Sequence, residues 1–543
     1  MARTATFRQL IRYLQAARRV NLAAQGELPP IGRTEAQRLK LPPRSRRRFL
    51  KLAALATRSA LATSTLPHWE AAWSKASPRI AIVGGGIAGL NAAYQLKKAG
   101  LNATVYEARN RLGGRIFSVT GAVGEGLVTD LGGSLINTNH EDMLTLVKEF
   151  DLKLFNRVQN SQEFPFPATA YYFGGQILSE AKIAEKLRPL AGQISQDADL
   201  IDRDFERFAP DFDRLSVTAY LNQHSDKIPD PTIRTLIENS IRTEYGVEPE
   251  AASAIQLLLN LPTVKGKKVE VLGNSDETFV VEGGSGRIID SLAAALAGQI
   301  QTGMRLSKLE SDGSGFRLNF VGHSPIAADW VILAIPFTVL REIEVTVDLP
   351  PKLRRFIDEV SLGFNDKIIA GFNNKVWRKR HGFVEEIWTD LGFSEAWDET
   401  QRQVERQAGA ITFFFGGNEV ATIQNGNDVS QGKRIIDQFE SAIPGAKAAA
   451  NGKFSRTEWT KDPLTQGGYT NFRPGQLTEF SEFLYVESKK PEECREVRVK
   501  NLVFAGEQVS DEFYGYMNGA AQTGRLAAEI IIREKLVLPN LSW

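Results

Sequence analysis

The chain has 543 residues, of which 42% are hydrophobic and 24% charged. This composition is ordinary for a soluble globular protein, so it excludes intrinsic disorder and a multi-span membrane protein, and the length predicts about two to four domains or one interleaved body. The single cysteine, Cys494, excludes an intrachain disulfide and a thiolate zinc site. None of the five histidines has metal-ligand spacing, so we expect no metal.

The charge is divided unevenly along the chain. Residues 1–77 contain 15 Lys and Arg but 3 Asp and Glu, a net charge of +12, and the rest of the chain has a net charge of −10. The positive charge therefore belongs to an N-terminal extension and not to a folded basic face. Nucleic-acid binding gains no support from it.

This extension contains a motif typical of protein export. Residues 45–51 read S-R-R-R-F-L-K, which matches the twin-arginine export pattern at every defined position. The apolar stretch that follows, residues 52–66, is too short and too polar to span a bilayer stably. We therefore expect residues 1–77 to be a twin-arginine signal with a basic extension, and the protein to be periplasmic or extracellular. A basic disordered tail is the alternative, and peripheral membrane association is left open.

The folded part begins with a strand, a glycine-rich turn, a helix and a second strand. Residues 80–83 are an apolar run suited to a buried parallel strand, and they lead into the sequence G-G-G-I-A-G. A helical pattern follows and ends at Gly100, and the next strand, residues 103–106, ends at Glu107. This order within about 30 residues predicts a dinucleotide-binding site.

Each residue type in this unit has a physical role. Gly84 permits the tight turn, Gly86 lets the backbone approach a pyrophosphate, and Gly89 allows close packing of helix on strand. The N-terminus of the helix offers unpaired N–H groups to the phosphates. Glu107 can accept hydrogen bonds from both ribose hydroxyls and would repel a 2′-phosphate, which disfavours NADP.

The rest of the chain alternates between helical and strand patterns. Residues 140–260 are predicted to be largely helical, with heptad-like apolar spacing in 183–200 and in 217–261. The later patterns indicate strands near 278–281, 316–320, 330–335 and 502–505, and a terminal helix at 519–532.

The run that follows Glu107 favours FAD. Residues 107–115 read E-A-R-N-R-L-G-G-R, and here the sequence resembles the flavin-dependent amine oxidase superfamily, which includes monoamine, polyamine and L-amino-acid oxidases. Carotenoid desaturases and protoporphyrinogen oxidases share the motif, so it indicates the cofactor better than the reaction. Gly113 and Gly114 permit a backbone turn, and Arg115 can reach the pyrophosphate as a charge-assisted donor.

Further matches extend the resemblance over nearly the whole chain from residue 78. They are D-L-G-G-S at 130–134, V-E-G-G at 281–284, F-A-G-E at 504–507 and G-Y-M-N-G-A-A at 515–521. The resemblance implies that the first of these passes beside the isoalloxazine ring, that Glu507 contacts the ribityl hydroxyls, and that the last helix points its N-terminus at the flavin. The residues expected to hold FAD are Gly84, Gly86, Ala88, Gly89, Glu107, Ala108, Arg115, Gly132, Gly133, Ser134, Glu507, Tyr516, Met517 and Ala520.

The resemblance also implies three features of a reaction centre. Lys367 matches a lysine that holds a water near flavin N5, with a surface lysine as the alternative. Tyr469 and Tyr516 match an aromatic pair that flanks the substrate amine, with core aromatics as the alternative. Gly468 is followed by Tyr469 where monoamine oxidases have the cysteine that attaches the flavin, so the FAD should be bound non-covalently.

The substrate is less well defined by these motifs. The overall pattern favours an L-amino-acid oxidase or dehydrogenase giving a 2-oxo acid and ammonia, and a primary-amine or polyamine oxidase is the alternative. Desaturase-like and protoporphyrinogen-oxidase-like flavoenzymes, and a non-catalytic FAD binder, stay open. The arginine that binds the substrate carboxylate in one type of L-amino-acid oxidase is replaced by Leu135, and Arg473 is a candidate substitute. The electron acceptor is expected to be oxygen or a quinone.

The resemblance implies an α/β fold in which a Rossmann-like FAD-binding domain is interleaved with an α+β substrate domain. We expect FAD-binding pieces at 78–150, 275–340 and 455–535, substrate-domain pieces at 151–274 and 341–454, and a tail at 536–543. The sequence does not indicate an oligomeric state.

Overall fold

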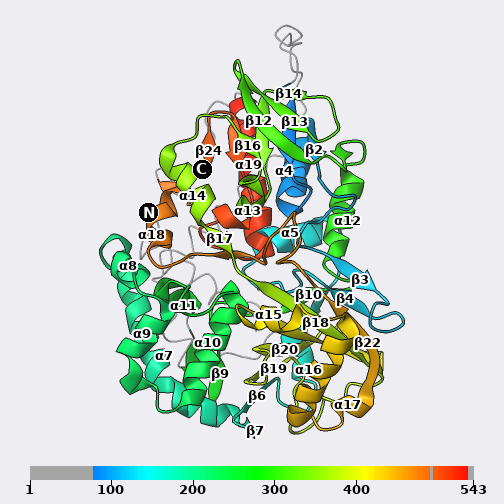
Figure 1. The fold of residues 1–543 in the computed structure, drawn as a ribbon, viewed down its shortest axis with the longest axis vertical. Helices are drawn as coiled ribbons and strands as arrows, with labels where there is room; N and C mark the ends of the chain where they lie inside the picture. The colour runs from blue at the N-terminus through cyan, green and yellow to red at the C-terminus, as the bar shows by residue number, and fades with distance from the viewer. Residues whose placement is uncertain (1–77, 261, 489–492, 536–543) are drawn as a thin grey trace, which may run out of the picture. The chain divides into compact units, whose positions relative to one another are not determined.

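Residues 78–260, 262–488 and 493–535 are described by a computed structural model (Figure 1). The expected export signal and the C-terminal tail lie outside these residues. Parallel and mixed sheets are combined with many helices, so the predicted α/β class is confirmed. The boundaries between the two expected domains stay predictions.

The first sheet contains the glycine-rich unit predicted from the sequence. Its six strands lie in the order β11 (Ile300–Gln301), β2 (Ala103–Tyr106), β1 (Ile80–Val83), β15 (Trp330–Leu333), β25 (Leu502–Phe504) and β24 (Arg498–Val499). All neighbours are parallel except β24, which is antiparallel to β25. Strands β1 and β15 are buried along their whole length, as the apolar runs predicted.

Helices and a small sheet cover the two faces of this sheet. Helix α4 (Ile87–Lys98) packs against both α12 (Gly286–Ala295) and α19 (Met517–Lys535). A second, four-stranded sheet packs against the first. The ring centroid of its Phe320 lies 4.9 Å from that of Tyr106 in β2. Its strands are β14 (Ile326–Ala328), β13 (Gly315–Phe320), β12 (Leu306–Asp312) and β16 (Glu344–Val345).

The first and last of these helices lie side by side (Figure 1, blue α4 and red α19). A Cβ added at Gly524 would lie 2.2 Å from the carbonyl oxygen of Ala88, so only glycine allows this approach. The side chain of Asn91 donates to the Ala521 carbonyl at 2.7 Å. Helix α19 is longer at both ends than the predicted 519–532. Among the described residues, no helix has both the length and the apolar character that crossing a membrane requires.

The largest sheet has seven strands. They are, in order, β22 (Ala450–Arg456), β18 (Asn365–Phe372), β21 (Gly409–Gly416), β20 (Glu395–Asp398), β19 (Glu386–Thr389), β6 (Thr169–Phe173) and β7 (Gln176–Leu178). One face packs on α16 (Asp428–Ala442), where the ring centroids of Phe413 and Phe439 are 5.1 Å apart. The opposite face carries a mixture of charged and aromatic side chains.

The predicted helical region is largely helical from residue 180, and before that residue two short helices alternate with strands. Its helices are α7 (Glu180–Arg203), α8 (Phe205–Asp213), α9 (Val217–Gln223), α10 (Pro231–Tyr245) and α11 (Ala254–Asn260). The apolar spacing over 217–261 is divided among α9, α10 and α11. A new helix begins at Pro231, because Asp230 accepts a hydrogen bond from the Thr232 N–H. Residues 154–178 include the strand β5 (Leu154–Asn156) and the strands β6 and β7.

Shorter elements connect these parts. Strand β5 pairs with β10 (Phe279–Val281). The remaining elements are β3 (Ser118–Thr120), β4 (Val128–Asp130), α5 (Glu141–Glu149), α6 (Arg157–Ser161), β8 (Thr263–Lys265), β9 (Lys268–Glu270), α13 (Phe337–Leu340), α14 (Pro351–Glu359), β17 (Ser361–Leu362), α15 (Glu419–Ile423), α17 (Ala446–Ala449), β23 (Thr470–Asn471) and α18 (Gln476–Phe480).

Candidate active site

The glycine-rich turn between β1 and α4 combines tight packing with open space. Gly84 has φ +109°, and a Cβ there would lie 2.4 Å from the Ala334 carbonyl oxygen. A Cβ at Gly89 would lie 2.0 Å from the Gly84 oxygen, whereas a Cβ at Gly86 would meet nothing within 4 Å. Within residues 78–260, 262–488 and 493–535, no side chain caps the N-terminus of α4, so its first N–H groups are available to a phosphate.

Glu107 joins the end of β2 to this turn. Its buried carboxylate accepts hydrogen bonds from the backbone N–H of Gly85 at 2.7 Å and from that of Arg109 at 2.8 Å. Ala108, between the two, is partly buried. The carboxylate therefore lies beside the open space at Gly86, where the sequence predicts the adenosine part of the cofactor.

An ion pair connects the E-A-R-N-R-L-G-G-R run, residues 107–115, with the F-A-G-E motif, residues 504–507. Arg115 Nη1 lies 2.8 Å from Glu507 Oε1 and donates to the Gly468 carbonyl at 2.7 Å. Glu507 also accepts hydrogen bonds from the Gly515 N–H at 2.8 Å and from the Thr470 hydroxyl at 3.0 Å. The structure thus brings Arg115 and Glu507 together, and their contacts to the cofactor stay predictions.

The D-L-G-G-S segment packs between this ion pair and the last helix. A Cβ at Gly132 would lie 1.9 Å from the Arg115 carbonyl oxygen, and one at Gly133 would lie 2.8 Å from the Met517 side chain. The Asp130 carboxylate accepts from Arg402 Nη1 at 2.8 Å and from the Ser285 N–H at 3.1 Å. The segment is therefore fixed from both sides against the N-terminal turn of α19, which also contains Ala520. Ser134, at its end, is buried.

Lys367 lies on β18 and reaches the same segment. It is 6% exposed, and its Nζ donates to the carbonyl oxygens of Asp130 at 3.1 Å and of Gly132 at 2.7 Å. The ammonium also lies 5.2 Å from the centroid of the Trp397 ring. Burial lowers the pKa of this lysine. The alternative of a surface lysine is therefore wrong.

The two predicted tyrosines approach the site from neighbouring loops. The Tyr516 hydroxyl donates to Glu244 Oε2 at 2.9 Å, and the Tyr469 hydroxyl donates to the Thr243 carbonyl. A Cβ at Gly515 would lie 3.9 Å from Tyr469, so the tyrosine segments are adjacent. Burial raises the pKa of both hydroxyls, which keeps both neutral.

Comparison with known proteins identifies the family. Residues 87–532 match the family described as flavin containing amine oxidoreductase. The chain belongs to this family. It is 24% identical over 479 residues to the flavin-containing amine oxidase of Oncorhynchus mykiss, over 85% of this chain and 87% of that protein. It is 25% identical to the probable flavin-containing monoamine oxidase A of Dictyostelium discoideum, over 85% and 99%.

Solved structures of amine oxidases share the fold of this flavin amine oxidoreductase. A putrescine oxidase bound to putrescine has a TM-score of 0.69 and 22% identity, and the match covers 84% of this chain and 99% of that one. A cyclohexylamine oxidase from Brevibacterium oxydans has a TM-score of 0.67 and 20% identity, over 84% and 99%. At these identities the likeness shows the fold alone.

FAD is the cofactor of this flavin amine oxidoreductase. The residues present fit it, because the open space at Gly86 adjoins an uncapped helix N-terminus and a carboxylate at the end of the second strand. Glu107 would hold the ribose, the N-terminus of α4 the pyrophosphate, and the segment from Gly132 to Ser134 would lie beside the flavin ring. When bound, FAD supplies the acceptor for a hydride.

Replacing Gly86 by alanine tests the cofactor site directly. The new methyl group meets no protein atom, so we expect the stability of the apoprotein to change by about 0.5 kcal/mol or less. The same methyl group fills space that the pyrophosphate needs, so we expect FAD affinity to fall at least about tenfold. Titration of the apoprotein with FAD, followed by flavin fluorescence, measures this, and reversibility tests the expected non-covalent binding.

The matched control is Gly192→Ala on the exposed surface of α7, where a Cβ also meets nothing within 4 Å. It should leave FAD affinity unchanged. Wild-type affinity in Gly86→Ala would contradict the predicted position of the pyrophosphate.

Sequence reasoning missed a group of carboxylates in this site. One carboxylate oxygen from each of Glu277, Glu386 and Glu395 lies within 4.8 Å of the others. Glu244, bound to Tyr516, acts electrostatically on Glu277 and Glu395. Desolvation raises the pKa of Glu244 to about 7, and desolvation and like charges raise the pKa of the three clustered carboxyls.

The register of the large sheet explains how the cluster forms. Lys367 pairs with Phe414, Phe414 with Glu395, and Trp397 with Glu386, so these side chains share one face of the sheet. The repeated pattern Glu-apolar-Trp, at 386–388 and 395–397, was a signal in the sequence. In each of these two strands, the pattern places a glutamate and a tryptophan on the same face.

Arg157 is the cation of this cluster. Its Nη1 lies 3.8 Å from Glu277 Oε2, and its Nε donates to Gln401 at 3.2 Å. Its Nη2 is buried and has no hydrogen-bond partner in the part of the chain that the structure describes. Glu277 has φ +40°, an unusual conformation for a residue other than glycine. The suggestion that Arg473 binds a substrate carboxylate was wrong, because Arg473 is exposed at the start of the turn that precedes α18.

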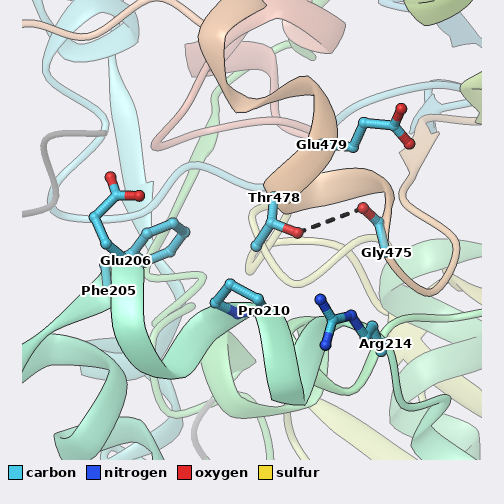
Figure 2. Close-up of a pocket in the computed structure, with 7 residues that line it drawn as sticks. All are labelled: Phe205, Glu206, Pro210, Arg214, Gly475, Thr478 and Glu479. Carbon is cyan, nitrogen blue, oxygen red and sulfur yellow. Dashed lines mark hydrogen bonds between the residues drawn. The ribbon is translucent and has the colours of Figure 1, made fainter.

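A surface pocket of about 340 Å³ lies elsewhere, between α8 and α18. Figure 2 shows Thr478 of α18 above Pro210 of α8, with Arg214 below the turn at Gly475. Its lining residues are Phe205, Glu206, Pro210, Arg214, Gly475, Thr478 and Glu479. None of these is a predicted site residue, so this pocket is not part of the candidate active site.

Proposed function

We propose that this flavin amine oxidoreductase oxidises the C–N bond of a primary aliphatic amine, with non-covalent FAD as the hydride acceptor. The observation that carries the proposal is the hydrogen bond from Tyr516 to Glu244. Tyr469 lies next to the Tyr516 segment, and the buried Lys367 binds the D-L-G-G-S segment. An aliphatic amine is protonated at neutral pH, and it must lose that proton before its α-carbon can give up a hydride. Glu244, whose pKa is raised to about 7, is placed to accept it.

The tyrosines and the lysine would then orient the neutral amine. Two neutral aromatic rings give the substrate nitrogen a dry, shaped surface. Lys367 uses two of its three donors on the Asp130 and Gly132 carbonyls, so one remains for a water at the site. The imine product hydrolyses to an aldehyde and ammonia. Oxygen or a quinone would reoxidise the cofactor.

An L-amino-acid substrate is the second candidate. The unpartnered Nη2 of Arg157 favours it, because a buried guanidinium N–H is a good donor to a substrate carboxylate. The relatives named above are monoamine and putrescine oxidases, and a primary amine fits at least as well. With an amino acid, the hydrolysed imine would be a 2-oxo acid.

Anaerobic bleaching of the purified yellow protein distinguishes these substrates. We expect primary amines to reduce the flavin, seen as loss of its visible absorption, and secondary and tertiary amines to be poorer. The panel also includes L-amino acids, D-amino acids and polyamines. Bleaching by neutral L-amino acids alone would replace the first candidate by the second. An unbleached flavin throughout the panel would overturn the proposed function.

We also propose export by the twin-arginine route. The S-R-R-R-F-L-K sequence at 45–51 supports this, and it lies outside the described residues. Twin-arginine substrates cross the membrane folded, which suits a protein whose cofactor site joins the first and last parts of its fold. Fractionation of the source cells tests it, and recovery of the protein only from the cytoplasm would contradict it.

A further inference from the structure

We infer that the substrate carries a second positive charge at the end away from the reacting amine, and that Glu277, Glu386 and Glu395 bind this charge. The inference rests on the proposed function and names the class of amine. The shared chemistry is a dicationic aliphatic amine, either an α,ω-diamine or a basic amino acid.

The first observation is the excess of carboxylates in the cluster. Three carboxylate oxygens lie within 4.8 Å of one another, and they share one guanidinium: among the described residues, Arg157 forms an ion pair with Glu277 at 3.8 Å and acts electrostatically on Glu386 and Glu395. Carboxylates this close repel one another, and burial strengthens the repulsion. A cation between them would relieve it.

The second observation is that Glu395 has no donor. It is 6% exposed, and among the described residues nothing donates a hydrogen bond to its carboxylate. By contrast, Glu386 accepts from the Trp388 indole N–H at 3.1 Å and from the Thr169 hydroxyl at 3.4 Å. A buried carboxylate without donors is costly, and an ammonium group supplies up to three of them.

The third observation is the aromatic surface around the carboxylates. Trp388 and Trp397 stand on the same face of the sheet as Glu386 and Glu395. Lys367 already lies 5.2 Å from the Trp397 ring centroid, which shows that this surface takes a cation. Indole rings also pack well against the methylene chain that would join two amino groups. A divalent metal ion would gain nothing from them.

The cluster acts electrostatically on the two tyrosines of the predicted reaction centre. Glu277 and Glu395 act electrostatically on the Tyr469 hydroxyl, and Glu277 acts on that of Tyr516. One end of a dicationic amine would therefore lie between the tyrosines and give its proton to Glu244, while the other end keeps its proton and binds the cluster.

The test compares substrates matched in carbon number but not in charge. Flavin reduction is measured anaerobically with 1,5-diaminopentane against n-pentylamine, and with L-lysine against L-norleucine. We expect kcat/KM to favour the dication by about tenfold to a hundredfold in at least one pair. A preference in the first pair identifies diamines, and a preference in the second pair alone identifies basic amino acids.

Glu395→Gln keeps the shape of the side chain and removes its charge. We expect it to lower kcat/KM for the preferred dication by about tenfold or more and to shrink the ratio within the pair. The bis-quaternary ion pentamethonium, which cannot form an imine, provides a second readout. Its Kd for the holoenzyme, measured by calorimetry, should rise in the same variant.

The matched control is Glu419→Gln. Glu419 is also a buried carboxyl with a raised pKa, about 6, but it accepts hydrogen bonds from Ser394 and the Gly416 N–H and is not in the cluster. It should leave the ratio and the pentamethonium Kd unchanged.

Three outcomes would overturn the inference while the proposed function stands. One is equal kcat/KM within both substrate pairs. Another is a ratio that Glu419→Gln changes as much as Glu395→Gln does. The last is tight binding of Mg²⁺ or Ca²⁺ that is lost in Glu395→Gln, which would make the cluster a metal site. Failure of every amine to reduce the flavin would instead overturn the proposed function.

Discussion

Replacing Lys367 by methionine is expected to slow anaerobic reduction of the flavin by amine by about a hundredfold or more. Methionine fills the space of the lysine stem but donates no hydrogen bond, so the carbonyls of Asp130 and Gly132 lose their donor. The segment predicted to lie beside the flavin ring then loses its fixed position, and the third donor of the lysine is lost with it. Stopped-flow absorbance at saturating amine measures the rate.

Lys375→Met is the matched control. Lys375 is a second lysine whose pKa is lowered by burial, and its Nζ donates to the carbonyls of Thr400 at 2.9 Å and Gln403 at 3.0 Å. The two variants should lose similar stability, because each leaves two carbonyls without a donor. Only Lys367→Met should slow the reduction of the flavin by amine. An unchanged rate in Lys367→Met would show that the lysine has no part in the reaction.

Arg402→Leu is expected to lower the free energy of unfolding by about 3–5 kcal/mol and to release FAD. Arg402 and Asp130 form an ion pair at 2.8 Å with side chains 2% and 0% exposed, and Glu399 lies 3.6 Å from the same guanidinium. Without the arginine, Asp130 is a buried charge next to the Gly132 and Gly133 backbone. Urea denaturation and the FAD content after gel filtration measure the two effects.

The control for this variant is Arg79→Leu. Its partner Asp329 lies 2.7 Å away, but the two side chains are 58% and 40% exposed. Water screens such a pair, so the loss of stability should be far smaller than in Arg402→Leu, with FAD retained. If Arg402→Leu lowered the free energy of unfolding as little as Arg79→Leu and kept its FAD, the buried ion pair would not be what fixes the D-L-G-G-S segment.

The cofactor-binding half of the fold could be predicted because its signals are local. Between Ile80 and Glu107 the chain forms, in order, a strand, a glycine turn, a helix, a second strand and an acidic residue. Each glycine of the turn is explained by one close contact or by one open space. The break between α9 and α10 was equally local, since Asp230 and Pro231 form a helix start that the apolar spacing concealed. In that case capping chemistry prevailed over hydrophobic periodicity.

The carboxylate cluster could not be predicted in the same way. Glu386 and Glu395 come from neighbouring strands, Glu277 from the segment before β10, and Arg157 from the start of α6. The local sequence does not indicate that these segments come together, because their contact depends on the register of the seven-stranded sheet. Motif matching found the residues around the cofactor and missed those that we propose select the substrate.

The contact between α4 and α19 has a consequence for biosynthesis. Among the described helices, α4 is the first to leave the ribosome and α19 the last, and Gly524 of α19 packs directly on Ala88 of α4. Domains generally fold as synthesis proceeds from the N-terminus, but this one is incomplete until its final helix emerges. We therefore expect a chain that stops before α19 not to retain the flavin, so that the yellow colour of a purified sample would report the presence of this helix.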